Sequence, residues 1–126
     1  MSRQIIKTDK APGAIGPYNQ GVRAGGFLFT AGQIPLDPKT MEVVGATAAE
    51  QARQALLNAK GIVEAAGLTM NDVVKATVFI RDMGQFGAIN EVYATFFPGE
   101  PPARSVVEVS RLPKDVLVEV ELVAYA

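Results

Sequence analysis

The sequence predicts an α+β fold in which a mostly antiparallel sheet carries two helices on one face. Three observations predict it: an early glycine-linked hairpin, two segments with helical periodicity, and a final strand with strict alternation. The chain has 126 residues, of which 48% are hydrophobic, so one core can form without a disulfide or a metal. We therefore expect a single domain over residues 1–126.

The first predicted elements are two short strands. Gly25-Gly26 separates residues 21–24 from residues 27–32, and a two-glycine link between apolar segments is typical of a tight hairpin. Residues 34–40 contain two prolines, which cannot donate hydrogen bonds within a sheet. This segment is predicted to be a surface loop.

Two segments have the periodicity of amphipathic helices. Thr47 and Glu50 have capping-box spacing, and apolar residues then recur every three or four positions until Gly67. Asp82 and Gln85 predict a second capping box. The apolar positions of that second helix are Phe86, Ile89, Tyr93, Phe96 and Phe97.

Three further segments are predicted to be strands, over residues 73–80, 105–109 and 116–125. Residues 112–115 are interpreted as a hairpin-like connection. The predicted inward positions are Val74, Ala76, Val78 and Ile80 in the first strand, and Val116, Val118, Val120, Leu122 and Ala124 in the last.

The other face of the last strand bears on assembly. Glu119 and Glu121 alternate there with Leu117, Val123 and Tyr125, so a face not covered by helices is partly apolar. A partner subunit would cover it, whereas a solvated sheet with scattered apolar residues needs no partner. The pattern leaves both alternatives open.

The residue inventory limits the chemistry. The chain has no histidine and no cysteine, which excludes imidazole bases, cysteine nucleophiles and most zinc sites, so neither a metal nor a cofactor is expected. Twelve basic and 13 acidic residues give a net charge of −1, which disfavours nucleic acid as the main partner. Without a signal pattern or an apolar segment of about 20 residues, we expect a cytoplasmic protein that is not associated with membranes.

Arg104 and Glu119 are the leading candidates for chemistry. Arg104 follows Pro101-Pro102 at a strand start, where an arginine commonly forms a surface ion pair but can also bind a carboxylate. Glutamate is depleted in strands, and the neighbouring Glu121 would raise the pKa of Glu119. In a shared cleft, Glu119 would position or deprotonate water beside a carboxylate bound by Arg104.

Two more polar residues have both structural and functional interpretations. Tyr18 follows a stiff Gly-Pro turn, where its phenol can donate to a ligand or pack against the fold. Asn90 lies among the apolar positions of the second predicted helix, as a cap, a core contact or a ligand contact. Lys114 is interpreted as a solvated turn residue.

Five segments carry a family resemblance. They are Ala14-Ile15-Gly16-Pro17-Tyr18, Thr30-Ala31-Gly32-Gln33-Ile34-Pro35, Pro102-Ala103-Arg104-Ser105, Leu112-Pro113-Lys114 and Val118-Glu119-Val120-Glu121. In this order, and with two helices between them, they resemble the RidA family, also called the YjgF family, of reactive-intermediate (imine) deaminases. The resemblance implies a chorismate-mutase-like fold and a homotrimer around a central β-barrel, with sites between subunits.

The resemblance also implies an activity and its residues. The activity is hydrolysis of 2-iminobutanoate and 2-iminopropanoate to 2-keto acids and ammonia, without a metal or cofactor. Arg104 would bind the substrate carboxylate, and Glu119 would help to activate water. The other implied substrate-binding positions are Tyr18, Gly32, Asn90 and Val106.

Three positions depart from the family pattern: Ala31 replaces a frequent serine, Val106 a frequent cysteine, and Pro101 an aromatic or apolar residue. The missing serine hydroxyl removes a potential hydrogen bond, so substrate preference is expected to differ. An alternative from another class is a noncatalytic regulatory trimer that binds small carboxylates through Arg104. Ribonuclease activity is attributed to some members of the family. The near-neutral net charge and the absence of histidine argue against a conventional acid–base nuclease here.

Overall fold

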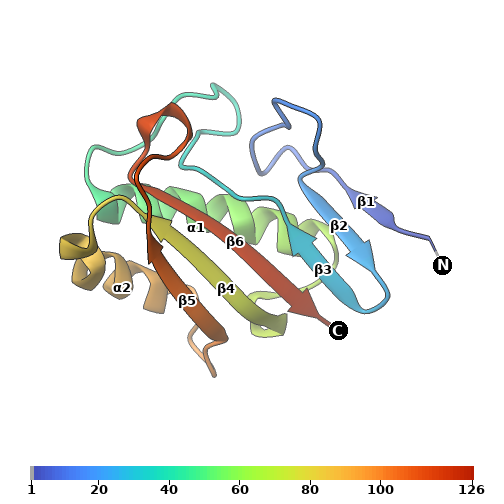
Figure 1. Ribbon diagram of the computed structural model, residues 1–126. Helices are drawn as coiled ribbons and strands as arrows, with labels where there is room; N and C mark the ends of the chain where they lie inside the picture. Colours follow the sequence, from blue (N-terminus) through green and yellow to red (C-terminus); the bar gives the residue numbers. More distant parts are fainter. Residues whose placement is uncertain (1) are drawn as a thin grey trace.

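The computed structural model describes residues 2–126 and is organised around a six-stranded sheet in the order β1-β2-β3-β6-β4-β5 (Figure 1). Neighbouring strands are antiparallel except for β4 and β5, which run parallel. The predicted α+β class is confirmed, with a mixed and open sheet rather than a closed barrel within residues 2–126. The strands are β1 (Gln4–Ile6), β2 (Gly21–Ala24), β3 (Phe27–Thr30), β4 (Val73–Ile80), β5 (Ala103–Glu108) and β6 (Val118–Tyr125).

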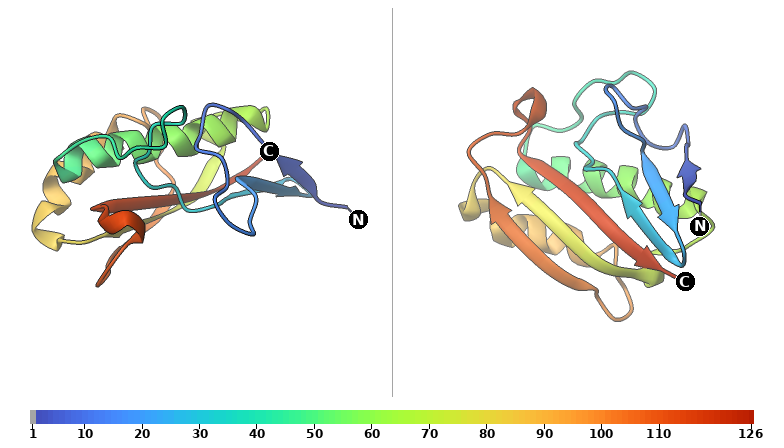
Figure 2. Two further views of the ribbon diagram at one scale, coloured as in Figure 1. Left: turned by 90° about the horizontal axis from the view of Figure 1, so that it is seen from above. Right: turned by 45° about the vertical axis from the view of Figure 1, so that its right-hand side comes forward.

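Helices α1 (Ala48–Ala65) and α2 (Phe86–Ala94) both lie on one face of this sheet (Figure 2). The capping box at the start of α1 is confirmed, because Thr47 Oγ1 accepts from the Glu50 amide at 3.2 Å and Glu50 Oε1 accepts from the Thr47 amide at 3.1 Å. No helix within residues 2–126 is both long and apolar enough to cross a membrane.

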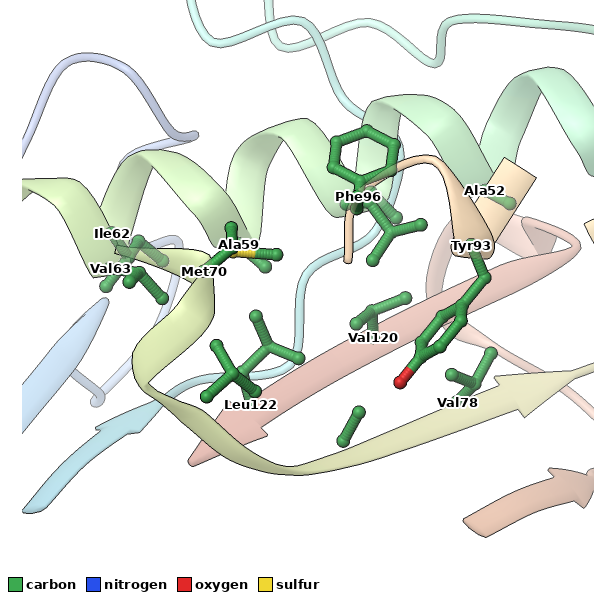
Figure 3. Close-up of a cluster of buried hydrophobic side chains, with 14 of the residues drawn as sticks. Ala52, Ala59, Ile62, Val63, Met70, Val78, Tyr93, Phe96, Val120 and Leu122 are labelled. Carbon is green, nitrogen blue, oxygen red and sulfur yellow. The ribbon is translucent and has the colours of Figure 1, made fainter. Parts of the chain in front are cut away.

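The main core lies between the two helices and strands β4 and β6 (Figure 3). Val118, Val120 and Leu122 point toward the helices and are at most 1% exposed. Alanines of α1, including Ala55 and Ala59, face them, and their small side chains allow the helix to approach the sheet closely. The alternation predicted for the last strand is therefore confirmed over residues 118–124, with the odd-numbered positions on the other face. The strand begins at Val118 rather than Val116, and Val116 is buried in a separate, smaller core.

The prediction for Val74 was wrong. Val74 is 45% exposed, whereas Val73 is 5% exposed and belongs to the core. The pairing with β6 shifts between Val73 and Lys75, so one extra residue interrupts the alternation. Beyond this bulge, the even-numbered positions of β4 face the core as expected.

The start of α2 also differs from the prediction. Asp82 caps a short 3₁₀ turn, η2 (Met83–Gln85), by accepting from the Gly84 amide at 2.8 Å. Gln85 then occupies the N-cap position of α2 without a side-chain capping bond to the residues described. The predicted second capping box is therefore absent from residues 2–126, because a tight turn comes between Asp82 and the helix.

The connection between β5 and β6 is not a hairpin. These strands are separated in the sheet by β4, and the chain crosses between them through a 3₁₀ turn, η3 (Pro113–Asp115). The parallel pairing of β4 and β5 follows from the helical crossover through α2. Lys114 is exposed in η3, as predicted, and has a positive φ of 55°.

Candidate active site

Glu119 and Gly32 lie against each other on the sheet face that the helices leave uncovered. Gln33 exchanges two backbone hydrogen bonds with Val120, at 2.7 and 3.0 Å, which fixes the segment after β3 beside β6. A Cβ at residue 32 would lie 3.0 Å from the carboxyl carbon of Glu119 and would collide with Oε2. Glycine at residue 32 therefore leaves the space that the Glu119 carboxylate occupies.

A cavity of about 280 Å³ opens at this contact. Tyr18, Gly32 and Glu119 all line it, so the structure brings three of the predicted site residues together. Ala31, where a serine hydroxyl was noted as missing, also lines the cavity. The rest of the lining is mostly apolar and includes Pro12, Ile15, Ile34, Leu36, Met41 and Pro113.

Burial changes the acidity of Glu119. Loss of solvent is the main cause that raises the pKa of this carboxyl above its ordinary value, and the nearby Glu121 adds a like-charge contribution. The predicted effect of Glu121 is confirmed, although burial is the larger cause. A carboxylate with a raised pKa is a stronger base, and can accept a proton from water more readily than an ordinary glutamate.

Tyr18 retains a hydrogen that it can donate to a ligand. Its phenolic oxygen accepts from the Ile15 amide at 3.3 Å, within the exposed turn that forms one wall of the cavity. Because the oxygen is the acceptor in that bond, the phenolic hydrogen remains available. Tyr18 can therefore supply a polar contact in a cavity that is otherwise mostly apolar.

Arg104 lies at the start of β5 and is held by α2. Its Nη1 donates to Asn90 Oδ1 at 2.6 Å, and its guanidinium carbon lies 4.7 Å from the Tyr93 ring centre and 5.4 Å from that of Phe86. Among residues 2–126, Arg104 has no salt-bridge partner. The alternative that Arg104 forms an ion pair within its own chain is therefore wrong. A guanidinium has five N–H groups, so Arg104 retains donors for a carboxylate.

Val106 belongs to the same strand as Arg104 and lies two residues further on. It aligns with Val78 of β4 and packs against the main core. The structure therefore groups Asn90, Arg104 and Val106 at the β5 edge of the sheet, separate from the cavity lined by Glu119.

These two groups lie on opposite faces of the sheet. Arg104 aligns with Ala76, which is fully buried under the helices, and its guanidinium contacts α2. Glu119 lies between Val118 and Val120, whose side chains point into the helix-covered core, so its own side chain points the other way. A single chain therefore does not bring Arg104 and Glu119 into one cleft.

Sequence reasoning missed several residues that shape these two groups. Phe86 and Tyr93 were predicted only as core positions, yet both rings contact Arg104. The signal was present, because Phe86, Asn90 and Tyr93 have i, i+4, i+7 spacing and share one helix face. Ile34 and Leu36 were placed in a surface loop but are buried in a small second core, with Leu112 and Val116.

Two buried amides hold the walls of the cavity. Gln20 Nε2 donates to the carbonyls of Thr8, Ala11 and Pro12 at 2.8 to 3.1 Å, which ties down the N-terminal loop. Asn58 Nδ2 of α1 donates to the carbonyls of Ile34 and Leu36 at 3.1 and 2.9 Å. These bonds fix irregular segments that lack a sheet ladder. The walls of the cavity are therefore held in place by hydrogen bonds within the chain.

The fold and site define a small α+β domain with a carboxylate of raised pKa in a small cavity and an arginine on the opposite sheet face. The family described as Endoribonuclease L-PSP matches residues 8–126. The chain belongs to this family, the RidA or YjgF family that its motifs resemble, as predicted.

Individual relatives match over almost the whole chain. A RutC family protein of Pyrococcus horikoshii is 56% identical over 123 residues, covering 98% of both chains. A protein of Escherichia coli named 2-iminobutanoate/2-iminopropanoate deaminase is 55% identical over 124 residues, covering 96% of both.

Solved structures are equally similar. E. coli TdcF, described with bound serine, has a TM-score of 0.94 at 52% identity, over 98% of both chains. The YjgF gene product of E. coli has a TM-score of 0.93 at 54% identity, over 97% of this chain and 98% of its own.

Proposed function

We propose that this protein hydrolyses 2-imino acids, including 2-iminobutanoate and 2-iminopropanoate, to 2-keto acids and ammonia. The observation that carries this proposal is the half-buried Glu119 carboxylate, held against Gly32 in a small and mostly apolar cavity. The relative with that activity in its name is 55% identical over nearly the full length. A base poised beside a small cavity is what the addition of water to an imine requires.

In the proposed mechanism, Arg104 binds the substrate carboxylate through its remaining N–H donors, while Asn90 holds the guanidinium. Glu119 accepts a proton from water as the water oxygen bonds to the imine carbon, and the C=N bond becomes a single bond. Glu119 then returns the proton to nitrogen. The carbon–nitrogen bond breaks and ammonia leaves, while the ionised Glu119 takes the proton of the new hydroxyl group as the carbon–oxygen double bond of the keto acid forms. Tyr18 and the backbone groups of Gly32 and Val106 position the substrate.

The chemistry asks little of the protein, because a protonated imine is already electrophilic. Each tenfold in rate corresponds to about 1.4 kcal/mol of barrier. Orientation of the substrate by Arg104 and of one water by Glu119 is enough for a useful acceleration. No covalent intermediate with the protein is needed.

We also propose that the protein is a homotrimer with a chorismate-mutase-like arrangement, whose sheets surround a central barrel and whose sites lie between subunits. The opposite placement of Arg104 and Glu119 supports this, because a second copy can supply the missing half of each site. The uncovered face also carries exposed aromatic residues. The ring centroids of Phe27 and Tyr125 are 4.8 Å apart, with the rings tilted, and Phe29 lies beside Phe27. Burial of these rings would favour association.

A noncatalytic trimer that binds small carboxylates is the alternative. The structural neighbour TdcF, described with bound serine, is consistent with either function, since serine carries a carboxylate. The raised pKa of Glu119 favours catalysis, because a site that only binds anions does not need a carboxylate that acts as a base.

The discriminating experiment generates imines in place with a dehydratase and follows keto-acid and ammonia release. We expect wild-type protein to accelerate imine loss, and Arg104→Ala and Glu119→Gln to abolish most of the acceleration. If wild type binds 2-keto acids but does not exceed the buffer rate, the protein is a carboxylate-binding module.

A further inference from the structure

Met41 has a backbone conformation that favours glycine. Its φ is 63°, in the left-handed region, where a side chain crowds the backbone. The preceding turn holds it there, because the Met41 amide donates to the Asp37 carbonyl at 2.8 Å and the Asp37 side chain accepts from the amides of Lys39 and Thr40. The turn is thus fixed by its own hydrogen bonds, and a glycine at residue 41 would fit it with less strain.

The side chain of Met41 lies where it affects the proposed site. It is half-buried, lines the cavity with Glu119, and packs against the second core formed by Ile34, Leu36, Leu112 and Val116. Strain in a non-glycine residue persists only where the surroundings enforce it, and such residues concentrate at functional sites. Here the strained residue is one whose side chain forms part of the cavity wall.

The cavity wall around Met41 is suited to an aliphatic group. Ile34, Leu36 and Met41 give it an apolar surface, and Ala31 adds a methyl group. The volume of about 280 Å³ is near the lower end of ligand sites, which run from about 300 Å³ upward. A change in one wall residue therefore changes the space for substrate by a large fraction.

We propose that Met41 is a specificity-determining residue, whose side chain limits the length of the aliphatic group that a 2-imino acid can place in the cavity. This inference rests on the proposed function for the identity of the ligand. It predicts a preference for short side chains in the wild-type protein, relaxed when residue 41 is made smaller.

The test measures binding of two product acids, 2-oxobutanoate and 4-methyl-2-oxopentanoate, by titration calorimetry. In wild type, the shorter acid should bind more tightly. In Met41→Gly, the dissociation constant of the branched acid divided by that of the shorter acid should fall about tenfold. Met41→Leu keeps an apolar side chain of similar volume, and its ratio should stay within about twofold of wild type.

Lys114→Gly is the matched backbone control. Lys114 also has a positive φ, of 55°, but it is exposed and does not line the cavity. The ratio of the two dissociation constants in Lys114→Gly should equal that of wild type. An unchanged ratio in Met41→Gly, an equal change in Lys114→Gly, or failure of wild type to bind either acid would each overturn the inference. Imine hydrolysis, measured separately on wild type, decides the proposed function independently of this ratio.

Discussion

Arg104 and Glu119 lie on opposite faces of the same sheet, Arg104 against α2 and Glu119 on the face away from both helices. In the proposed mechanism, the two side chains that one site needs would therefore come from different copies of the chain. This relationship turns the proposed oligomer into a requirement for activity, and it makes the sharing of sites directly testable.

Mixed oligomers test that sharing. Arg104→Ala and Glu119→Gln should each be inactive alone, because every site lacks one partner. When the two variants are unfolded and refolded together in equal amounts, about a quarter of the sites should combine a normal Arg104 with a normal Glu119. Imine hydrolysis should return to about that fraction of the wild-type rate. Recovery would fail if each chain supplied a complete site, and sedimentation showing only monomers would contradict the trimer.

A methyl group at residue 32 should displace the carboxylate without unfolding the protein. The three atoms nearest to the Cβ of Gly32→Ala all belong to the side chain of Glu119, whose end can swing away, so the free energy of unfolding should fall by no more than about 1 kcal/mol. Misplacement of the base by about 1 Å should lower kcat/KM about 100-fold.

Gly87→Ala is the control for this substitution. Its added Cβ meets nothing within 4 Å, and Gly87 is inside α2, so the variant should gain up to about 1 kcal/mol of stability and keep its activity. Chemical denaturation and imine hydrolysis on both variants separate the two effects. Normal kcat/KM in Gly32→Ala would show that the position of Glu119 is not critical.

The aromatic contacts to Arg104 predict an effect on substrate binding. Phe86→Leu removes a ring 5.4 Å from the guanidinium carbon, and such contacts contribute about 0.5 to 1 kcal/mol at partly exposed sites. KM should rise about two- to fivefold with little change in kcat, because the carboxylate is bound equally in the ground and transition states. Ile89→Leu, a conservative change at a buried position of the same helix that removes no aromatic ring, should leave both constants unchanged. A fall in kcat alone would contradict a positioning role for Phe86.

Local sequence chemistry predicted the elements that depend on neighbouring residues. The capping box of Thr47 and Glu50, the turn at Gly25-Gly26 and the alternation of residues 118–124 each follow from interactions within a few positions. The bulge at Val74 depends instead on pairing with a distant strand. Local patterns carry no information on such pairings.

The candidate site likewise has features that the local sequence predicts and features that depend on the pairing of distant strands. Glu119 was identified as an unusual strand residue, but its contact with Gly32 depends on the bridge between Gln33 and Val120. The face on which Arg104 lies is set by its register with Ala76 of β4. Sequence reasoning could therefore name candidate residues, but it could not show that they separate into two groups.

The last prediction concerns pH. Because burial raises the pKa of Glu119, the folded protein holds this proton more tightly than the unfolded chain does. The stabilising contribution is fully present below the ordinary glutamate pKa, and it is lost as pH rises through the raised pKa. Glu119→Gln has no carboxyl at this position and does not lose this contribution. The free energy of unfolding of the variant minus that of wild type should therefore be smallest in acid. It should grow between the ordinary glutamate pKa and the raised pKa of Glu119, and stay constant above that range. Denaturant titrations at several pH values measure this difference in the free energy of unfolding. Glu121→Gln removes the like charge, so the pKa of Glu119 should be raised less and the pH range of the change should end at a lower pH. A difference in stability between Glu119→Gln and wild type that is the same at every pH would show that folding does not raise the pKa of Glu119.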